Sequence, residues 1–478
     1  MTTVMTEEDL AFAGVRAQAD LVASGEISSV ELVDLSLRRI AGAQPTLGAF
    51  TCVLDDEARA AAEQADAARA AGDTRPLLGV PIAVKDDVDV AGHPTRFGCD
   101  GRFDAKTEDS EIVRRLRDAG AVVVGKTTSP ELGQWPIAEG PWFEPTRNPW
   151  HLDHTPGGSS GGAAAAVAAG LVPGAIGSDG AGSVRIPASW TNLVGVKPQR
   201  GRLSTWPDPE AFHGLTCFGP LTRTVDDAAL MLDALSGNVE GDRHAPPAPP
   251  IPLSEAITRP TRRLRIALSF RAPFALVPKL LDDEVEAATR RTAELLRDLG
   301  HEVVEREPHY GLVGLSFVPR STVALRHWAE KCEDRKLLDK RTRENLLLGR
   351  ILDGPALAGS RALEPVFRRR VGAIFRDADV VLAPTTAGPP LPIGSLDGLT
   401  PWETHQLVVG TCPYAWAWNV IGWPGVSVPA GHTEKGLPVG AQLLGPANSE
   451  PLLLALAGEL EAAERWHERR PTLPLSAA

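Results

Sequence analysis

Two glycine-rich turns, close together in the chain, constrain its fold more than any other feature of the sequence. The first reads Gly157-Gly-Ser-Ser-Gly-Gly162 and leads into a run of alanines, and the second reads Asp179-Gly-Ala-Gly-Ser183. Glycine allows backbone conformations that a Cβ forbids, and alanine has the highest helix propensity. The pattern therefore predicts a tight loop feeding a helix, a buried strand over Leu171–Ser178 and a second tight turn.

Helical and strand-like segments alternate around these turns. We expect a capping box at Ser28-x-x-Glu31, because the hydroxyl and carboxylate can satisfy each other's helix-end N–H groups. Continuous apolar runs bounded by turn residues favour buried strands. Such alternation predicts an α/β fold with a parallel or mixed sheet. The expected helices are Thr6–Ala23, Ser29–Ala43, Glu57–Ala71 and Ser110–Ala119, and the expected strands are Leu78–Val84 and Ala121–Val124.

The second half of the chain continues the pattern after a proline-rich stretch at about 238–263, which we interpret as a surface crossover. The segment at about 310–375 is expected to be helical and to shape the substrate site. No internal repeat is found. Residues 1–478 are expected to form one large domain, since large α/β enzymes often exceed the usual domain size. The remaining expected elements are a helix at Asp282–Leu299 and strands at Leu264–Ser269, Glu302–Glu305, Asp379–Pro384 and Gly425–Pro429.

Charge and cysteine content narrow the function classes. The 49 basic and 61 acidic residues leave a net charge of −12, which disfavours nucleic acid or an anionic membrane as a partner. The five cysteines are scattered and none forms a Cys-x-x-Cys pair, so neither a zinc site nor a disulfide framework is indicated. Acidic residues Glu7-Glu8-Asp9 stand where a secretion signal needs basic ones, and no apolar run is long enough to span a bilayer. We expect a cytoplasmic protein.

A third motif precedes the two turns, at Gly79-Val-Pro-Ile-Ala-Val-Lys85-Asp86. Together the three resemble the signature of the amidase signature family of serine hydrolases. Ser159 and Ser183 are 24 positions apart, the spacing associated with the paired serines of that family. The resemblance runs from about Glu8 to Gly445, and it implies an α/β domain whose mixed sheet is covered by helices on both faces.

The resemblance also implies roles for individual residues. Lys85, Ser159 and Ser183 would form a Ser-cisSer-Lys triad, in which a cis peptide bond joins Gly158 to Ser159. Ser183 would be the nucleophile and Ser159 would carry protons between it and Lys85. The N–H groups of Gly180, Ala181, Gly182 and Ser183 would form an oxyanion hole, although many members have glycine where this chain has Ala181. Supporting roles fall to Ser160, Asp179 and Arg185. No metal or organic cofactor is implied.

Lys85 can act as a base only if its amine is neutral, which requires burial away from carboxylates. The apolar run Pro81–Val84 supplies the burial. Asp86 and Asp87 oppose it, because a nearby carboxylate favours the protonated amine. Alternation along a strand predicts that Asp86 points to the opposite face, whereas Asp87 is harder to dismiss.

Two accidental motifs offer other interpretations. Gly120-Ala-Val-Val-Val-Gly-Lys-Thr127 matches the phosphate-loop pattern, but its middle residues are typical of a strand rather than of a loop. Gly157-Gly-Ser-Ser-Gly161 matches the nucleophile elbow of α/β-hydrolases, with Ser159 as nucleophile and a downstream histidine such as His405 or His432. The elbow leaves Lys85 and the Ser183 turn unexplained.

A third alternative is the amidase subunit of the glutamine-dependent tRNA amidotransferase, one branch of the same family. That branch usually carries Asp-Thr-Gly-Gly-Ser, whereas this chain has Asp179-Gly-Ala-Gly-Ser183. The divergent segment 310–375 also argues against that branch.

The substrate is expected to be a small amide or carbamate, and the protein a monomer or homodimer. The sequence after Asp179 looks similar to hydrolases of cyclic nylon oligomers, aryl amides and synthetic urethanes. Several of the 11 tryptophans fall in loops expected near the site and suit an apolar pocket. We therefore expect hydrophobic or aryl amides, with carbamates as a further class, to be preferred over acetamide or glutamine. The candidate pocket residues are Trp135, Trp142, Trp206, Trp416 and Trp418.

Overall fold

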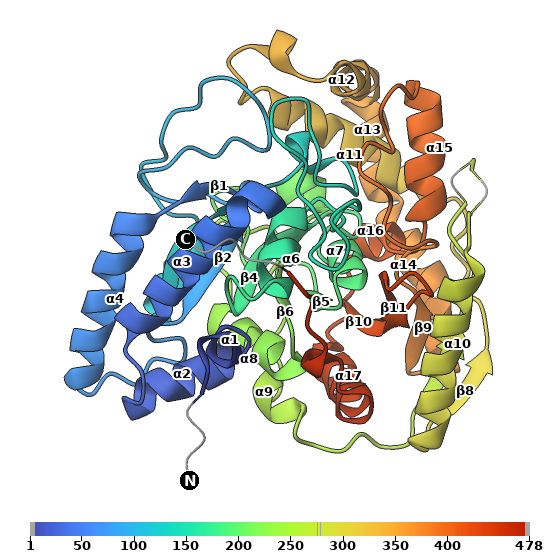
Figure 1. Ribbon diagram of the computed structural model, residues 1–478. Coiled ribbons are helices and arrows are strands. Elements are labelled where there is room, and N and C mark those ends of the chain that lie inside the picture. Colours follow the sequence, from blue (N-terminus) through green and yellow to red (C-terminus); the bar gives the residue numbers. More distant parts are fainter. Residues whose placement is uncertain (1–4, 275, 278, 474–478) are drawn as a thin grey trace.

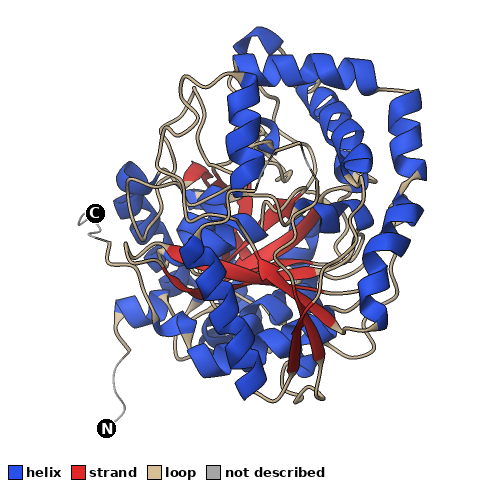
Figure 2. Ribbon diagram, turned by 90° about the vertical axis from the view of Figure 1, so that its right-hand side faces the viewer, coloured by secondary structure: helices blue, strands red, loops and turns tan. Residues whose placement is uncertain are grey.

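An eleven-stranded mixed β-sheet runs through the centre of the molecule, with helices on both faces (Figures 1 and 2). The computed structural model describes residues 5–274, 276, 277 and 279–473. The strand order is β1-β3-β2-β4-β6-β5-β10-β11-β9-β7-β8, so strands close in sequence are often separated in the sheet. Strands β3, β2 and β4 are parallel, as are β9, β7 and β8, and the pairs between them are antiparallel. The predicted α/β fold is confirmed.

The strands are short, and most are buried along their whole length. Seven lie at or close to the positions expected from the sequence. The other four, β1, β5, β6 and β11, were not singled out by apolar runs or turn residues. The bounds are β1 (Phe50–Val53), β2 (Pro81–Lys85), β3 (Val122–Thr127), β4 (Gly174–Asp179), β5 (Val194–Lys197), β6 (Cys217–Thr222), β7 (Arg265–Leu268), β8 (Glu302–Glu305), β9 (Val380–Pro384), β10 (Gly425–His432) and β11 (Pro438–Leu444).

The hydrophobic core has two layers, one on each face of the sheet, because successive strand residues point to opposite faces. Ile82 and Val84 of β2 belong to the layer beneath α5, α8, α9 and α17, whereas Ala83 packs with the alanines of α6 on the other face. A third cluster extends the second layer under α14 and α16. The α6 helix is buried at every residue, which small alanine side chains permit.

The helices follow the predictions with one clear correction. The helix expected over Thr6–Ala23 is interrupted at Gly14, which adopts φ of +93° and separates two helices. Ser28 and Glu31 form the predicted capping box. The α-helices are α1 (Glu7–Ala11), α2 (Val15–Ser24), α3 (Ser29–Leu47), α4 (Asp55–Ala70), α5 (Glu111–Asp118), α6 (Gly161–Ala168), α7 (Arg185–Trp190), α8 (Val225–Leu235), α9 (Leu253–Ala256), α10 (Asp283–Asp298), α11 (Gly314–Ala329), α12 (Lys340–Leu352), α13 (Pro355–Ala362), α14 (Glu364–Val371), α15 (Pro401–Thr411), α16 (Trp416–Ile421) and α17 (Glu450–Glu464).

Short 3₁₀ turns complete the helical segments, and two of them lie near the candidate site: η1 (Glu131–Gly133) and η2 (Ala211–Gly214). The segment 310–375 is mostly helical, as expected, and comprises α11 to α14 with their connections. No helix in the described ranges combines the length and apolar character needed to cross a membrane.

Candidate active site

Two neighbouring parallel strands bring the predicted catalytic residues together. Lys85 is the last residue of β2, and Asp179 is the last residue of β4, directly before the second glycine turn. Because β2 and β4 are parallel and adjacent, their carboxyl ends lie at the same edge of the sheet. The loop before α6 reaches this edge through a cis peptide bond between Gly158 and Ser159, as the family resemblance implies.

Lys85 is fully enclosed and hydrogen-bonded to two serines. Its Nζ donates to Ser159 Oγ at 2.7 Å and to Ser178 Oγ at 2.7 Å. Asp87 Oδ2 lies 3.2 Å from the same nitrogen, and it also accepts a hydrogen bond from Ser178 Oγ. Burial lowers the pKa of the Lys85 amine, and Asp87 acts in the opposite direction. Burial and the one close carboxylate therefore act in opposite directions on the protonation of this amine.

Asp86, which directly follows Lys85, points away from the Lys85 amine, as alternation predicts. Asp86 Oδ1 lies 3.2 Å from Nζ of Lys126, a buried lysine of β3. Lys126 also donates to Pro94 O and Thr95 Oγ1. Lys126 is thus part of a buried ion pair within a strand, which removes the phosphate-loop interpretation of residues 120–127.

The turn after β4 presents backbone donors beside the nucleophile candidate, Ser183. Gly182 N donates to Asp179 Oδ1 at 2.7 Å. This N–H is therefore already engaged, whereas the family resemblance predicts that it faces the substrate. Among the described residues, no hydrogen bond is found from the N–H groups of Gly180, Ala181 or Ser183. Gly180, Ala181 and Ser183 are partly exposed, whereas Gly182 is buried. The predicted four-donor oxyanion hole is therefore reduced to three candidate donors.

A buried network holds this turn in place. The Asp179 carboxylate accepts from Arg185 Nε and Nη2, both at 3.0 Å, and both side chains are fully buried. Burial alone would raise the pKa of Asp179, but Arg185 holds it well below its ordinary range. Asn419 Nδ2 donates to both the carbonyl and the carboxylate of Asp179, at 2.7 and 2.8 Å. Arg185 in turn donates to Asn419 Oδ1 at 2.7 Å and to Gln442 Oε1 at 3.1 Å.

Ser160 connects the two glycine-rich turns. Its N–H donates to Ser183 O at 3.2 Å, and its hydroxyl donates to Ser178 O at 3.2 Å. Ser178 N returns a hydrogen bond to Ser160 Oγ at 3.2 Å. Ser159, the neighbour of Ser160, is therefore fixed beside the turn that carries Ser183. The hydroxyl of Ser183 itself makes no hydrogen bond within the described part of the chain.

A cavity of about 400 Å³ adjoins this edge of the sheet. Asp87, Thr216 and Phe218 form the side nearest the catalytic residues, and Thr216 Oγ1 would lie 2.8 Å from a Cβ on Gly180. Phe97, Phe212 and Trp328 form an aromatic wall, in which Phe212 and Trp328 are 4.5 Å apart between ring centroids in an edge-on arrangement. The polar part of the lining includes Asp89, Lys106, Ser110, Thr205, Asp208, Glu210, His213, His327 and Lys331.

The five tryptophans predicted to line the pocket have different positions. Trp416 packs on Phe317, with ring centroids 5.0 Å apart, in the cluster that also contacts Ala181. Trp135 contributes the carbonyl that lies 2.7 Å from a Cβ built on Gly158, so its backbone borders the cis bond. Trp142 and Trp206 are 45% and 39% exposed on loops. Trp418 is fully buried, and its Nε1 donates to Gly445 O, so this one belongs to the core.

Sequence reasoning overlooked several residues around the catalytic edge. Ser178 was predicted only as the end of a strand, although its hydroxyl bridges Lys85 and Asp87. Gly133 lies close enough that a Cβ there would be 3.3 Å from Ser159 Oγ. Phe212 and Trp328 carry no local motif and meet only in the folded chain. The histidines of the elbow interpretation lie elsewhere, since His405 stacks on Trp402 and His432 packs on Trp150.

Comparisons with known proteins show which family the chain is similar to. The family model described as Amidase matches residues 31–454. A protein of Mycobacterium tuberculosis named "Putative amidase AmiA2" is 56% identical over 451 residues, which cover 94% of this chain and 93% of that protein. One of the subunits of a glutamyl-tRNA(Gln) amidotransferase from Roseiflexus is 35% identical over 480 residues, covering 94% of this chain and 96% of that one.

Solved structures give the same match over nearly the full length. The structure of 6-aminohexanoate cyclic dimer hydrolase superposes with a TM-score of 0.87 and 31% identity, covering 97% of this chain and 99% of that one. A bacterial aryl acylamidase superposes with a TM-score of 0.86 and 27% identity, with the same coverage.

Proposed function

We propose that this chain, which belongs to the amidase signature family and is an amidase, hydrolyses carboxamides with Ser183 as nucleophile. In the first step, Ser183 Oγ attacks the amide carbonyl, and the C–N bond then breaks to leave an acyl-enzyme. Water cleaves the acyl-enzyme in the second step and releases the acid. This division of one difficult step into two is the usual advantage of a covalent intermediate.

Lys85 and Ser159 would handle the protons. A neutral Lys85 accepts a proton from Ser159, which accepts one from Ser183 as the attack proceeds. The same proton then returns through Ser159 to the leaving nitrogen. The burial of Lys85 and its 2.7 Å contact with Ser159 support this relay, and the Ser160–Ser183 hydrogen bond supports the proximity of the two serines.

The N–H groups of Gly180, Ala181 and Ser183 would stabilise the oxyanion. Each well-placed donor in such a setting lowers the barrier by about 3 kcal/mol. The Asp179 carboxylate accepts the hydrogen bond of the Gly182 N–H, so Gly182 would shape the turn and would not donate to the oxyanion. The Asp179–Arg185 pair would keep that shape during turnover.

The contact between Lys85 and Ser159 carries this proposal, and active-site labelling tests it. A fluorophosphonate probe should modify Ser183, as located by peptide mass spectrometry. Labelling should be lost in Ser183→Ala and strongly slowed in Ser159→Ala. A label on Ser159 or Ser160 in the wild-type enzyme would instead support the nucleophile-elbow mechanism.

We propose hydrophobic substrates, aryl amides first and long-chain amides or carbamates second. The aromatic wall of Phe97, Phe212 and Trp328 supports this choice, as does the Phe317–Trp416 pair near Ala181. Burial of apolar substrate surface contributes roughly 25 cal/mol per Å². The aryl acylamidase and the cyclic dimer hydrolase among the similar structures act on amides of this general type by their names, which adds support.

A role as the amidase subunit of a tRNA amidotransferase is the second candidate, favoured by the 35% identical relative from such an enzyme. The Asp-Gly-Ala-Gly-Ser turn and the helices α11 to α14 argue for a free-standing amidase. Glutamine and a simple anilide separate the two candidates, since a free-standing aryl amidase should prefer the anilide.

The enzyme would work as a monomer or homodimer in the cytoplasm. All five cysteines are free thiols, and four of them are buried. Free thiols are typical of proteins that stay in a reducing compartment.

A further inference from the structure

A wide cavity lies away from the candidate catalytic edge, between the ends of β7 and β8 and helix α14. Its volume is about 1130 Å³, and it shares no lining residue with the cavity beside Asp87 in the described part of the chain. Phe270 and Arg271 follow β7, and Glu307 and His309 follow β8, so the floor is at the carboxyl ends of two parallel strands. Ligands of α/β sheets bind preferentially at such ends.

Cationic side chains dominate the lining. Arg271 and Lys279 come from the segment after β7, and Arg369, Arg370 and Arg376 come from α14 and the turn that follows it. Within the residues that the structure describes, none of these five forms an ion pair with a carboxylate. On a chain with a net charge of −12, such a local excess of positive charge is unusual.

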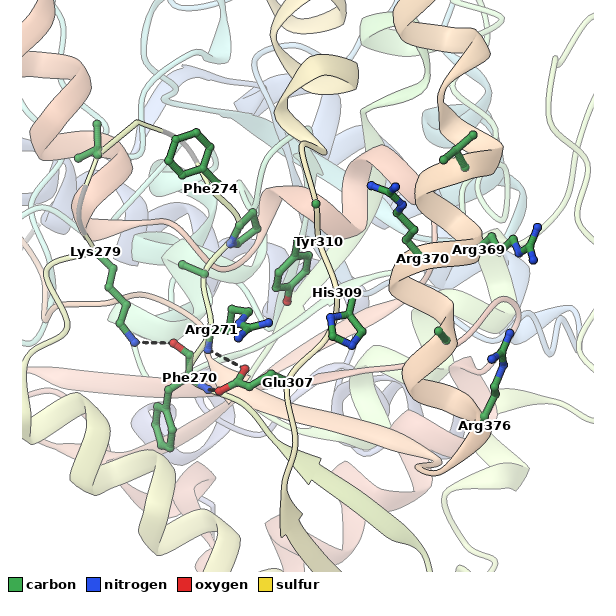
Figure 3. A pocket seen from close by; sticks show the side chains of 16 residues that line it. Phe270, Arg271, Phe274, Lys279, Glu307, His309, Tyr310, Arg369, Arg370 and Arg376 are labelled. Carbon is green, nitrogen blue, oxygen red and sulfur yellow. Dashed lines mark hydrogen bonds between the residues drawn. The ribbon is translucent and has the colours of Figure 1, made fainter.

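The single carboxylate of the lining does not neutralise them. Glu307 accepts hydrogen bonds from Ser269 Oγ and from the N–H groups of Phe270 and Arg271, the latter two at 3.3 and 3.0 Å. Its oxygens are therefore engaged by the β7 loop. Figure 3 shows the bonds from Phe270 and Arg271 to Glu307, with Arg271 and His309 beside Tyr310 and the arginines of α14 along one wall.

The same cavity offers apolar and aromatic surface. Tyr310 is buried at its floor, whereas the side chain of Phe274 is 60% exposed at its rim. Ala272, Pro273, Val277, Val366 and Ala373 add further apolar surface to the lining. An amphipathic molecule could cover the exposed Phe274 ring with its apolar part and pair its charged part with the arginines.

We propose that this cavity binds an amphipathic organic anion, a molecule that carries phosphate or carboxylate groups on an aromatic or aliphatic body. Arg271 and Arg370 bind the anionic groups from opposite sides, since Arg pairs with phosphate and carboxylate through two parallel hydrogen bonds. Phe274 and Tyr310 contact the apolar body. The site is separate from the amide-cleaving centre, so its occupation does not depend on catalysis.

Isothermal titration with three probes tests the need for both halves of the ligand. 1-Naphthyl phosphate combines a dianion with an aromatic body, inorganic phosphate carries the charge alone, and 1-naphthol carries the body alone. We expect saturable one-to-one binding of 1-naphthyl phosphate, at least tenfold tighter than either fragment, and weaker at high salt. Equal affinity for inorganic phosphate, or no saturable binding of the ester, would overturn the proposal.

Charge-removing variants locate the binding. Arg271→Gln combined with Arg370→Gln should weaken 1-naphthyl phosphate at least tenfold, whereas Arg350→Gln should leave it unchanged. Arg350 is an exposed arginine of α12 outside the cavity lining, and it matches the charge change of each substitution. Anilide hydrolysis by the double variant should equal that of wild type, which shows that it is folded. An equal loss in Arg350→Gln would show that only net charge matters, against the proposal.

Vesicles distinguish a lipid headgroup from a soluble ligand. The proposal predicts that phosphatidylglycerol vesicles at physiological salt do not sediment the protein, whereas the soluble ester binds. Sedimentation that depends on Arg271 and Arg370, without binding of the soluble ester, would overturn the cavity site in favour of a membrane-surface role.

Discussion

Asp87 Oδ2 lies 3.2 Å from Nζ of Lys85, and both side chains are almost completely enclosed. The carboxylate favours the protonated amine, whereas burial favours the neutral amine that the proposed relay requires. Asp87 therefore opposes the deprotonation of the amine that we propose as the base. Its place next to Lys85 also makes it the residue through which the pH dependence of the proposed relay can be moved.

Asp87→Asn should shift the rising limb of activity to lower pH. The neutral amide removes the main contact that raises the pKa of Lys85, so the amine loses its proton at lower pH. The asparagine oxygen can still accept the Ser178 hydrogen bond. The check is a profile of kcat/KM against pH for an anilide. Asp86→Asn, whose carboxylate faces Lys126, should shift the limb less. A limb that stays in place or moves upward would contradict the assigned roles.

Lys85→Met should lower kcat by about 10²–10⁴-fold, the usual contribution of a general base. Lys126→Met is the matched control, since it removes a second buried lysine from the neighbouring strand. That change leaves Asp86 buried without its partner, which destabilises a protein by about 3–5 kcal/mol. We expect Lys126→Met to lower Tm while the remaining folded enzyme keeps its kcat. Near-normal turnover by Lys85→Met would exclude lysine as the base.

Arg185→Met should destabilise the protein by about 3–5 kcal/mol, because the buried Asp179 carboxylate loses its ionic partner. Arg16 pairs with Asp226 at the surface, where both side chains are 37% exposed. Arg16→Met should therefore cost no more than about 1 kcal/mol. Urea unfolding followed by circular dichroism measures both values. Similar losses of stability in the two variants would contradict the stabilising role of the buried Asp179–Arg185 pair.

Lys197→Met should stabilise the protein at neutral pH. Burial lowers the pKa of Lys197 from 10.5 to about 8. Between these pH values the unfolded chain holds the additional proton, so the free energy of unfolding rises with pH across that window. Below pH 8 the full penalty applies, on the order of 3 kcal/mol. The variant should remove both the penalty and the rise, whereas Lys435→Met at an exposed site should change neither.

Trp328→Ala should reduce kcat/KM for an anilide more than for acetamide. Trp328 contributes the edge of the aromatic wall that would cover an aryl group but not a methyl group. Steady-state kinetics on the matched pair of substrates give the ratio directly. An equal loss for both substrates would mean that the wall supports the fold rather than the choice of substrate. A wild-type preference for glutamine over the anilide would contradict the proposed substrate class.

The candidate catalytic motifs could be recognised in the sequence because each is local. Lys85 ends an apolar strand, and Ser159 lies in a run of glycines, so short patterns identify both. The same locality explains why alternation alone predicts that Asp86 points away from the Lys85 side chain, whereas it left the effect of Asp87 open.

The remainder of the site depends on contacts between distant parts of the chain. Asn419 and Gln442 accept hydrogen bonds from Arg185, which lies 234 and 257 positions earlier in the chain, and no local pattern marks either residue. Phe212 and Trp328 form a wall only when η2 meets α11. The N–H of Gly182 was assigned to the oxyanion hole because nothing in the sequence shows that the Asp179 carboxylate turns back to it.

Several of these contacts involve residues that are synthesised late, which has a consequence for the newly made chain. Lys85, Ser159 and Ser183 all leave the ribosome before Arg185, but the hydrogen-bond network around Arg185 needs Asn419 and Gln442. At roughly 5–20 residues per second, the intervening segment takes about 13–50 s to synthesise. Strands β10 and β11, which fill the middle of the sheet, arrive in the same interval. A growing chain therefore carries Lys85, Ser159 and Ser183 before the contacts around Arg185 can form, and we expect no amidase activity until the residues up to Gln442 have been synthesised.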